Sequence, residues 1–363
     1  MNILNGIILA NTGPSLAIPG PYWLFTLLHW LTFALHLIAM NLLFGGLIIL
    51  LISKNSPFRK LMFDTEIRLF PTVMAATITL GVAPLLFTQV IYGKFFYTAT
   101  ILSSWQWFLI IPVLLITYYL LYLVAMKKNI SLSIKTNILW LALIGLIFIS
   151  FTYTALSDLA EKPELWNNLY KAAPGGTSLN PDWMQIFFRW AHMAVGAMAV
   201  AGIGILIFSL YFPKVKDNPD LQRFGARIYL LGVIKAALFG LIYLFTIDTK
   251  ILMEFLGSPG LHALLAGIIV NIGALIVLFK GLKNKTKTRQ AILWGSGLVL
   301  GGLFCMVSAR HYLRLIYLDK YFAPDKLTIG SQYSPLIMFL ITFVIGLGVL
   351  WWMLKKYFKS PAA

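Results

Sequence analysis

Long apolar stretches alternate with short polar segments along the whole chain. The apolar stretches number about nine, and most reach the roughly 20 residues that a helix needs to cross the hydrocarbon of a bilayer. The strands of a membrane barrel would instead give short alternating segments. The pattern therefore predicts an all-α, polytopic bundle of about nine transmembrane helices, near residues 22–53, 70–93, 104–126, 137–157, 183–212, 226–247, 258–279, 290–309 and 335–354.

The composition excludes a water-soluble protein. Apolar residues make up 60% of the 363 residues and charged residues only 11%, whereas a soluble chain needs roughly twice that charged fraction. We expect residues 1–363 to form a single membrane domain, with residues 1–157 holding the first four spans and residues 183–356 the last five. The external loop expected between them, 158–182, is rich in proline and glycine and is predicted to hold a short surface helix. Its aromatic residues Trp166 and Tyr170, with Trp183 just after it, suit the headgroup interface.

The net charge of +17 is distributed by loop. Every second loop is basic and together these loops hold most of the 29 lysines and arginines, whereas the charges of the alternate loops nearly cancel. Cytoplasmic loops carry the excess of positive charge, so we predict an external N-terminus, a short external segment before the first span and a cytoplasmic C-terminus. The charge thus indicates the orientation of the chain in the membrane, and anionic lipid headgroups would reinforce it. We expect a location in a prokaryotic inner membrane and no nucleic-acid partner.

The five histidines all fall in or near the outer two-thirds of the predicted bilayer. At a rise of about 1.5 Å per residue, His29 lies about 10 Å deep, His36 about 21 Å, His192 about 13 Å and His262 about 6 Å. His311 lies at the external end of the eighth span. Seven residues separate the first two, which puts both imidazoles on one helix face.

Neutral imidazole is the usual ligand of haem b iron, so the histidines predict a haem b site. His29, His36 and His192 are the candidate iron ligands, and depth favours the pair His29 and His192. His262 is a further candidate cofactor contact, and Arg189 and Arg310 are placed to neutralise haem propionates. The alternative for any single histidine is a hydrogen bond between helices, and for His311 an arginine–histidine cluster within 308–314.

The remaining polar residues narrow the chemistry. All twelve acids fall in loops or at span ends, which argues against a proton pump. Lys235 lies inside the sixth span, where it would pair with a haem propionate, a backbone carbonyl or a partner subunit, or face a water-filled pocket. The single cysteine, Cys305, excludes an internal disulfide and the attachment of c-type haem to this chain.

Two stretches resemble the large subunit of cytochrome bd quinol oxidase. They are HLIAMNLLFGG at residues 36–46 and TLGVAPLLFTQVIYG at residues 79–93; a weaker likeness covers RWAHMAVG at 189–196. The first stretch resembles a family helix in which an early histidine ligates haem. The resemblance, over about the first 250 residues, implies haem binding and quinol chemistry.

The sequence departs from that family at the oxygen-reducing end. The third span, which begins with the stretch from Ser104 to Pro112, has none of the family's membrane carboxylates, and Gln89 stands where the family has glutamate. The long external loop that contributes to quinol binding is also missing, since about ten residues follow position 247 before the next span. The departures favour a relative that retains haem and quinol chemistry but passes electrons elsewhere.

The leading hypothesis is a membrane b-type cytochrome subunit of a respiratory complex. Through haem b, it would exchange electrons between quinol or quinone near the outer leaflet and extracytoplasmic redox partners such as c-type cytochromes. His311, His262 and Glu254 are the candidate proton acceptors in quinol oxidation. The alternatives are a bd-type quinol oxidase subunit with altered ligands, and a cofactor-free transporter or structural membrane subunit.

Overall fold

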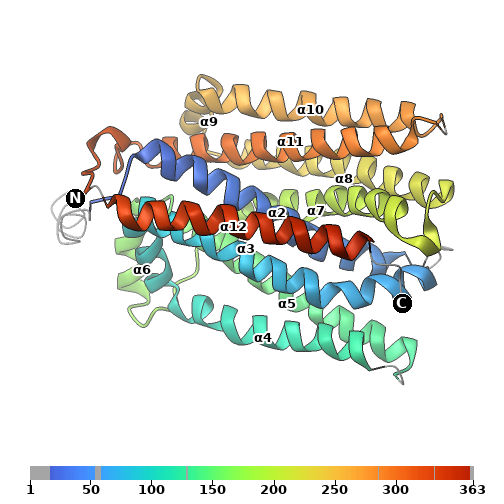
Figure 1. Cartoon of the computed structure of the whole chain (residues 1–363). Coiled ribbons are helices and arrows are strands. Elements are labelled where there is room, and N and C mark those ends of the chain that lie inside the picture. Colours follow the sequence, from blue (N-terminus) through green and yellow to red (C-terminus); the bar gives the residue numbers. More distant parts are fainter. Residues whose placement is uncertain (1–16, 54–58, 128–129, 285, 331, 360–363) are drawn as a thin grey trace.

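The computed structural model describes residues 17–53, 59–127, 130–284, 286–330 and 332–359 (Figure 1). In this part of the chain the structure has eleven α-helices and three short 3-10 helices, so the all-α prediction is confirmed. The segment predicted to precede the first span lies almost wholly outside the described residues.

Nine of the helices within the described residues are long and apolar enough to cross a membrane, so the chain is a multi-pass membrane protein. They are α2 (Tyr22–Ile52), α3 (Arg59–Leu102), α4 (Ser104–Met126), α5 (Leu132–Leu159), α7 (Trp183–Tyr211), α8 (Pro219–Thr246), α10 (Pro259–Gly281), α11 (Thr288–Tyr317) and α12 (Tyr333–Lys359). The short elements are the 3-10 helices Pro163–Leu165, Pro213–Val215 and Pro324–Lys326, together with α6 (Trp166–Ala172) and α9 (Thr249–Leu256).

Local sequence sets several of the helix boundaries. Asn218, Asp248 and Ser258 each accept hydrogen bonds from the first backbone N–H groups of α8, α9 and α10. Proline follows directly at the first position of α8 and α10, where a missing N–H costs nothing. The spans α8 and α10 therefore begin directly after a capping side chain, and most spans extend beyond the apolar stretch that predicted them.

The helices pack as antiparallel neighbours around a central pair (Figure 1). α3 lies against α2, α5 against α4, α8 against α7 and α11 against α10, and α2 packs along α7 between the two halves. Gly45 makes this central contact close, because any side chain there would collide with the backbone of Ala197. α12 packs against α2 and α3 mainly through Leu336, Phe339 and Leu340.

The bundle has two chemically different ends. We call the end where α2 begins and α5 finishes the cluster end, and the opposite end the basic end; Figure 1 shows them at left and right. Near the cluster end α3 is bent at Tyr92, whose backbone leaves the helical region. Trp166 is buried there against Phe95 and donates its indole N–H to the carbonyl of Leu159, so the prediction that it lies at the headgroup interface is wrong. Tyr170 and Trp183 are exposed.

The outward faces of α4, α8, α10 and α12 are covered with exposed apolar side chains. A soluble protein rarely exposes so much contiguous apolar surface, and a lipid bilayer is the environment that accepts it.

Candidate functional site: a repeated histidine arrangement and an ion cluster

His36 lies on α2 and turns its imidazole towards α3. Its Nδ1 is 3.0 Å from the backbone carbonyl oxygen of Thr77. Four residues further along α3, Gly81 leaves the space that the ring occupies: a methyl group there would lie 2.9 Å from the Cε1 and Nδ1 atoms of the imidazole. The absence of a side chain at Gly81 is what lets the ring rest on the helix backbone.

His192 repeats this arrangement on the other half of the bundle. It lies on α7, and its Nδ1 is 2.7 Å from the backbone carbonyl oxygen of Ala236 on α8. Gly240, again four residues further along, packs under the ring, and a methyl group there would lie 2.7 Å from Nδ1. The two helix pairs α2–α3 and α7–α8 thus present a histidine in the same way.

The hydrogen bond fixes the tautomer of both imidazoles. A backbone carbonyl oxygen only accepts, so Nδ1 must carry the proton that it shares with Thr77 or Ala236. In the neutral ring the lone pair then lies on Nε2. This form, with Nδ1–H held by a backbone carbonyl, is the one in which histidine binds metal ions and haem iron.

His29 lies closer to the cluster end and is held differently. Its Nε2 is 3.2 Å from the hydroxyl oxygen of Thr88 on α3, and that hydroxyl gives its only proton to the carbonyl of Pro84. His29 therefore donates from Nε2 to Thr88. Its Nδ1 is buried and has no hydrogen-bond partner among the described residues. The depths estimated from the sequence favoured His29 and His192 as the two ligands of one haem iron. In the structure the two rings have different hydrogen-bond partners on different helices.

His311 is buried on α11 between two tyrosines. Tyr22 on α2 has its hydroxyl 3.5 Å from Nε2, and Tyr92 on α3 has its hydroxyl 3.4 Å from Nδ1. The ring also meets the edge of Trp30 at a centroid distance of 5.1 Å. On the other side of Tyr92, the guanidinium of Arg314 lies 4.9 Å from the ring centroid. These contacts connect His311 to a cluster of charged residues.

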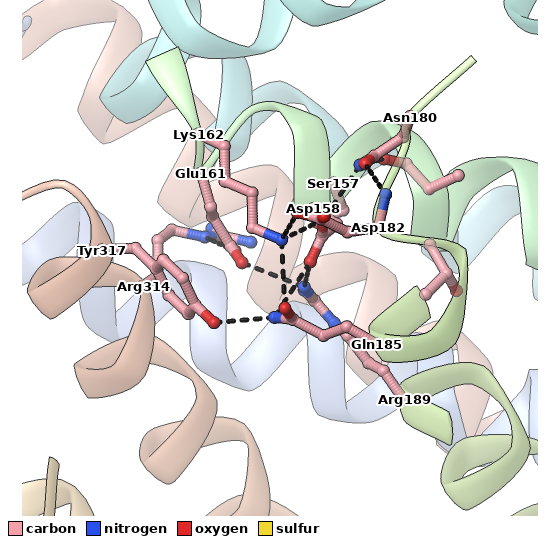
Figure 2. Close-up of polar contacts among 12 residues, drawn as sticks. Ser157, Asp158, Glu161, Lys162, Asn180, Asp182, Gln185, Arg189, Arg314 and Tyr317 are labelled. Carbon is pink, nitrogen blue, oxygen red and sulfur yellow. Dashed lines mark hydrogen bonds and ion pairs between the residues drawn. The ribbon is translucent and has the colours of Figure 1, made fainter. Parts of the chain in front are cut away.

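The ion cluster is centred on Glu161, just beyond α5 (Figure 2). Its carboxylate accepts hydrogen bonds from Arg189 at 3.0 Å, Arg314 at 3.1 Å and Arg310 at 3.2 Å. Burial alone would raise the pKa of the Glu161 carboxyl, but the three positive charges outweigh it and hold the pKa well below its usual range. Glu161 is therefore ionised, and it binds α7 and α11 to the end of α5.

A second set of contacts extends the cluster towards the loop. Lys162 lies 2.9 Å from the carboxylate of Asp158 and 2.6 Å from that of Asp182. Burial would lower the pKa of the Lys162 ammonium, but the charge of Asp158 and the hydrogen bonds with both carboxylates raise it. Gln185 accepts from Lys162 and donates to the hydroxyl of Tyr317 at 2.7 Å (Figure 2). Cations outnumber carboxylates by one in this cluster, since Lys162 and three arginines face Asp158, Glu161 and Asp182.

A cavity lies beside the ion cluster. The volume open to the centres of water molecules is about 20 Å³, room for one or two waters. Polar atoms of Glu161, Arg314 and Ser157 meet aromatic residues there, and the lining on α3 includes Thr88 and Tyr92, which touch His29 and His311. The cavity is too small for a quinone ring.

The other predicted site residues lie apart or have other partners. Glu254 on α9 and His262 on α10 are exposed and have no side-chain contact with His311 in the described part of the chain. Arg189 and Arg310, predicted to face haem propionates, have carboxylate partners in Glu161. Lys235 is exposed on α8. Among the described residues, no group of three or more histidine, cysteine or acidic side chains forms a site for a bare metal ion.

Sequence reasoning missed the ion cluster. It counted Asp158 and Glu161 as acids at a span end or in a loop, whereas both are almost completely buried. A usable signal was the spacing of Arg310 and Arg314, which puts two cations on one face of a helix at the same end as these acids.

No known protein-family model matches the chain, and no curated protein is significantly similar to it.

Proposed function

We propose that this protein is a b-type cytochrome subunit of a respiratory membrane complex, with its cluster end outside the cytoplasm. One observation carries the proposal: His36 and His192 occur in the same arrangement, each with Nδ1–H on a backbone carbonyl and its ring seated on a glycine. That arrangement suits an imidazole whose Nε2 binds haem iron. The resemblance of residues 36–46 and 79–93 to the cytochrome bd large subunit adds support, since it covers His36 and Gly81.

His36 and His192 are the residues that would hold haem b. Bound haem would supply one-electron transfer within the membrane. The residues around the two histidines set the orientation and tautomer of the rings, because Thr77 and Ala236 accept the Nδ1 protons and the glycines limit ring rotation. Two helix pairs that each offer one ligand are consistent with an electron carrier held between the two halves of the bundle.

The cluster end suits the exchange of protons that accompanies quinol oxidation. Oxidation of a quinol needs a proton acceptor, and His311 lies between the hydroxyls of Tyr22 and Tyr92. Tyr22 is only half-buried, so it connects the histidine with the surface of the bundle. The quinol itself would bind outside the water-sized cavity, near the outer leaflet. Electrons would leave to an extracytoplasmic redox subunit such as a c-type cytochrome.

The test is a reduced-minus-oxidised visible spectrum of the purified chain with its native partners, together with haem extracted per chain. We expect a b-type α band in the wild type. His36→Ala and His192→Ala should each lower the haem content, since each removes a ligand. His262→Ala is the matched control, because His262 is exposed and lies on α10, which belongs to neither helix pair; its haem content should equal that of the wild type.

His311 is tested in the same preparations by quinol-dependent reduction. We expect His311→Gln to slow reduction by quinol about tenfold or more, while haem content stays near that of the wild type. Equal loss of haem in His311→Gln and His36→Ala would contradict the separate roles.

A second candidate, a cofactor-free transporter, is favoured by the repeat itself. α2 and α7 both begin at the cluster end, so the repeated pairs run in the same direction, as the halves of some transporters do. Transporter sites are commonly formed by broken helices, and α3 is bent at Tyr92. Intact, partner-bound protein without haem would favour this candidate.

A further inference from the structure

Lys235 lies near the middle of the apolar part of α8. Arg227 is eight residues before it and Asp248 thirteen residues after it, which correspond to about 12 Å and about 20 Å along a helix. A lysine side chain extends over only four methylenes and so does not bring its ammonium to either interface. Lys235 is nevertheless exposed on the surface of the chain.

The surface around Lys235 is otherwise apolar. Leu231, Ile234, Leu238 and Leu241 are each about half exposed, and Phe245 is 77% exposed. Their spacing of three, four or seven residues puts them on one side of α8 with the lysine. We call this set, residues 231, 234, 235, 238, 241 and 245, the α8 stripe. It is a lipid-like face with a single charge in it.

An exposed charge at this depth is unfavourable unless it is paired. Placing a lysine at the centre of a membrane helix strongly disfavours insertion of that helix into the bilayer. Within the described residues, Lys235 forms no ion pair, and no side chain of α7 or α10 offers it a carboxylate. Lipid phosphates lie at the interfaces of a hydrocarbon layer about 30 Å thick, out of reach of Lys235.

A second copy of this chain does not supply the missing charge. All twelve acids of the sequence lie in loops or near helix ends, so none reaches the depth of Lys235. A two-fold symmetric dimer through the α8 stripe would instead bring two lysines together, and like charges in hydrocarbon repel strongly.

We propose that the α8 stripe is the docking surface for a different membrane protein, one with a transmembrane helix that carries an aspartate or glutamate at mid-membrane depth. The carboxylate would pair with the ammonium of Lys235, and the apolar residues around both would pack against each other. The charge of Lys235 would select the partner, because a transmembrane helix without an acid would leave the lysine unpaired. The proposal does not depend on whether the chain binds haem.

The first test is photocrosslinking of the full chain in its native membranes. Benzoylphenylalanine is introduced at position 234 or 238 in the α8 stripe, and at position 115 as the control, since Leu115 is 63% exposed in the middle of α4. We expect positions 234 and 238 to give one adduct with the same membrane protein, and position 115 to give no such adduct. Mass spectrometry of the adduct should place an aspartate or glutamate near the middle of the crosslinked helix.

The second test removes and then exchanges the charge. Lys235→Leu should still fold, because it replaces a lipid-facing charge with the residue type around it, but should lower the adduct yield about tenfold or more. Lys235→Glu combined with lysine at the partner's acid should restore the yield. Adducts with lipid alone, adducts with a second copy of this chain, or an adduct unaffected by Lys235→Leu would each overturn the proposal.

Discussion

The cluster end and the middle of the bundle stabilise buried polar side chains in different ways. At the cluster end, Glu161 is surrounded by three arginines, and opposite charges satisfy one another across α5, α7 and α11. In the middle, His36 and His192 each use one backbone carbonyl and carry no charged partner among the described residues. The first arrangement leaves its acceptors saturated, whereas the second leaves one ring nitrogen of each histidine available.

This difference suggests a division of roles. The ion cluster holds three helix ends together, and the acceptor oxygens of Glu161 are occupied by three arginines. A neutral imidazole whose Nδ1 proton is held by a carbonyl has its Nε2 lone pair free to bind a metal such as haem iron. Burial alone does not separate the two cases, since Arg310 and Arg314 of the ion cluster are half-buried, as His36 and His192 are. The hydrogen-bond partners of each polar atom distinguish a structural role from a ligand-binding role better than burial does.

The largest expected effect comes from Glu161→Gln. It leaves three arginines without their shared carboxylate, and breaking a buried ion pair costs about 3–5 kcal/mol of stability. Thermal unfolding in detergent should show a large fall in midpoint temperature. Glu164→Gln is the matched control, because Glu164 lies only three residues further along the chain but is exposed. Similar midpoints for the two variants would show that the cluster does not stabilise the fold.

The second effect is a loss of stability in acid that depends on Glu161. Because the folded-state pKa of Glu161 lies below its unfolded value, its contribution is complete above the unfolded pKa, about 4.3. It is lost as pH falls further, by about 1.4 kcal/mol per pH unit. Unfolding midpoints between pH 5 and pH 3 should therefore fall more steeply in the wild type than in Glu161→Gln. Parallel slopes would contradict the assignment.

The third effect tests the other region. Gly81→Ala and Gly240→Ala each introduce a methyl group into the space of an imidazole ring, and overpacking of this kind costs about 1–3 kcal/mol. Both variants should also lose haem, because the ring can no longer stay on its carbonyl. Gly93→Ala, on the same helix as Gly81, is the control, since its nearest neighbour would lie at an ordinary 3.7 Å. If both variants kept haem at the wild-type level, Gly81 and Gly240 would have no role in positioning the histidine ligands.

The smallest effect is expected at the link between the two regions. Tyr22→Phe removes one hydroxyl beside His311, at a hydrogen-bond length of 3.5 Å, and should change stability by only about 0.5 kcal/mol. It should nevertheless slow reduction by quinol, which stopped-flow absorbance measures. An unchanged rate would exclude Tyr22 from the proton path.

The spans were predictable from sequence because a helix that crosses hydrocarbon needs a continuous apolar stretch. Their ends were less predictable: α3 runs from Arg59 to Leu102, well beyond the apolar stretch 70–93, because a helix continues wherever its backbone bonds are satisfied. His36 and His192 were identified from depth and resemblance. Their shared arrangement was not, since the carbonyl and glycine partners lie more than forty residues away on another helix. Glu161 was missed because its burial depends on α7 and α11.

The most direct test of the central claim is the haem content of the native protein. The chain would be purified with its partners, oxidised and then reduced with quinol while visible spectra are recorded, and haem would be extracted and counted per chain. We predict a b-type α band that quinol reduces and that both His36→Ala and His192→Ala diminish. Intact protein with its partners but without haem would contradict the account.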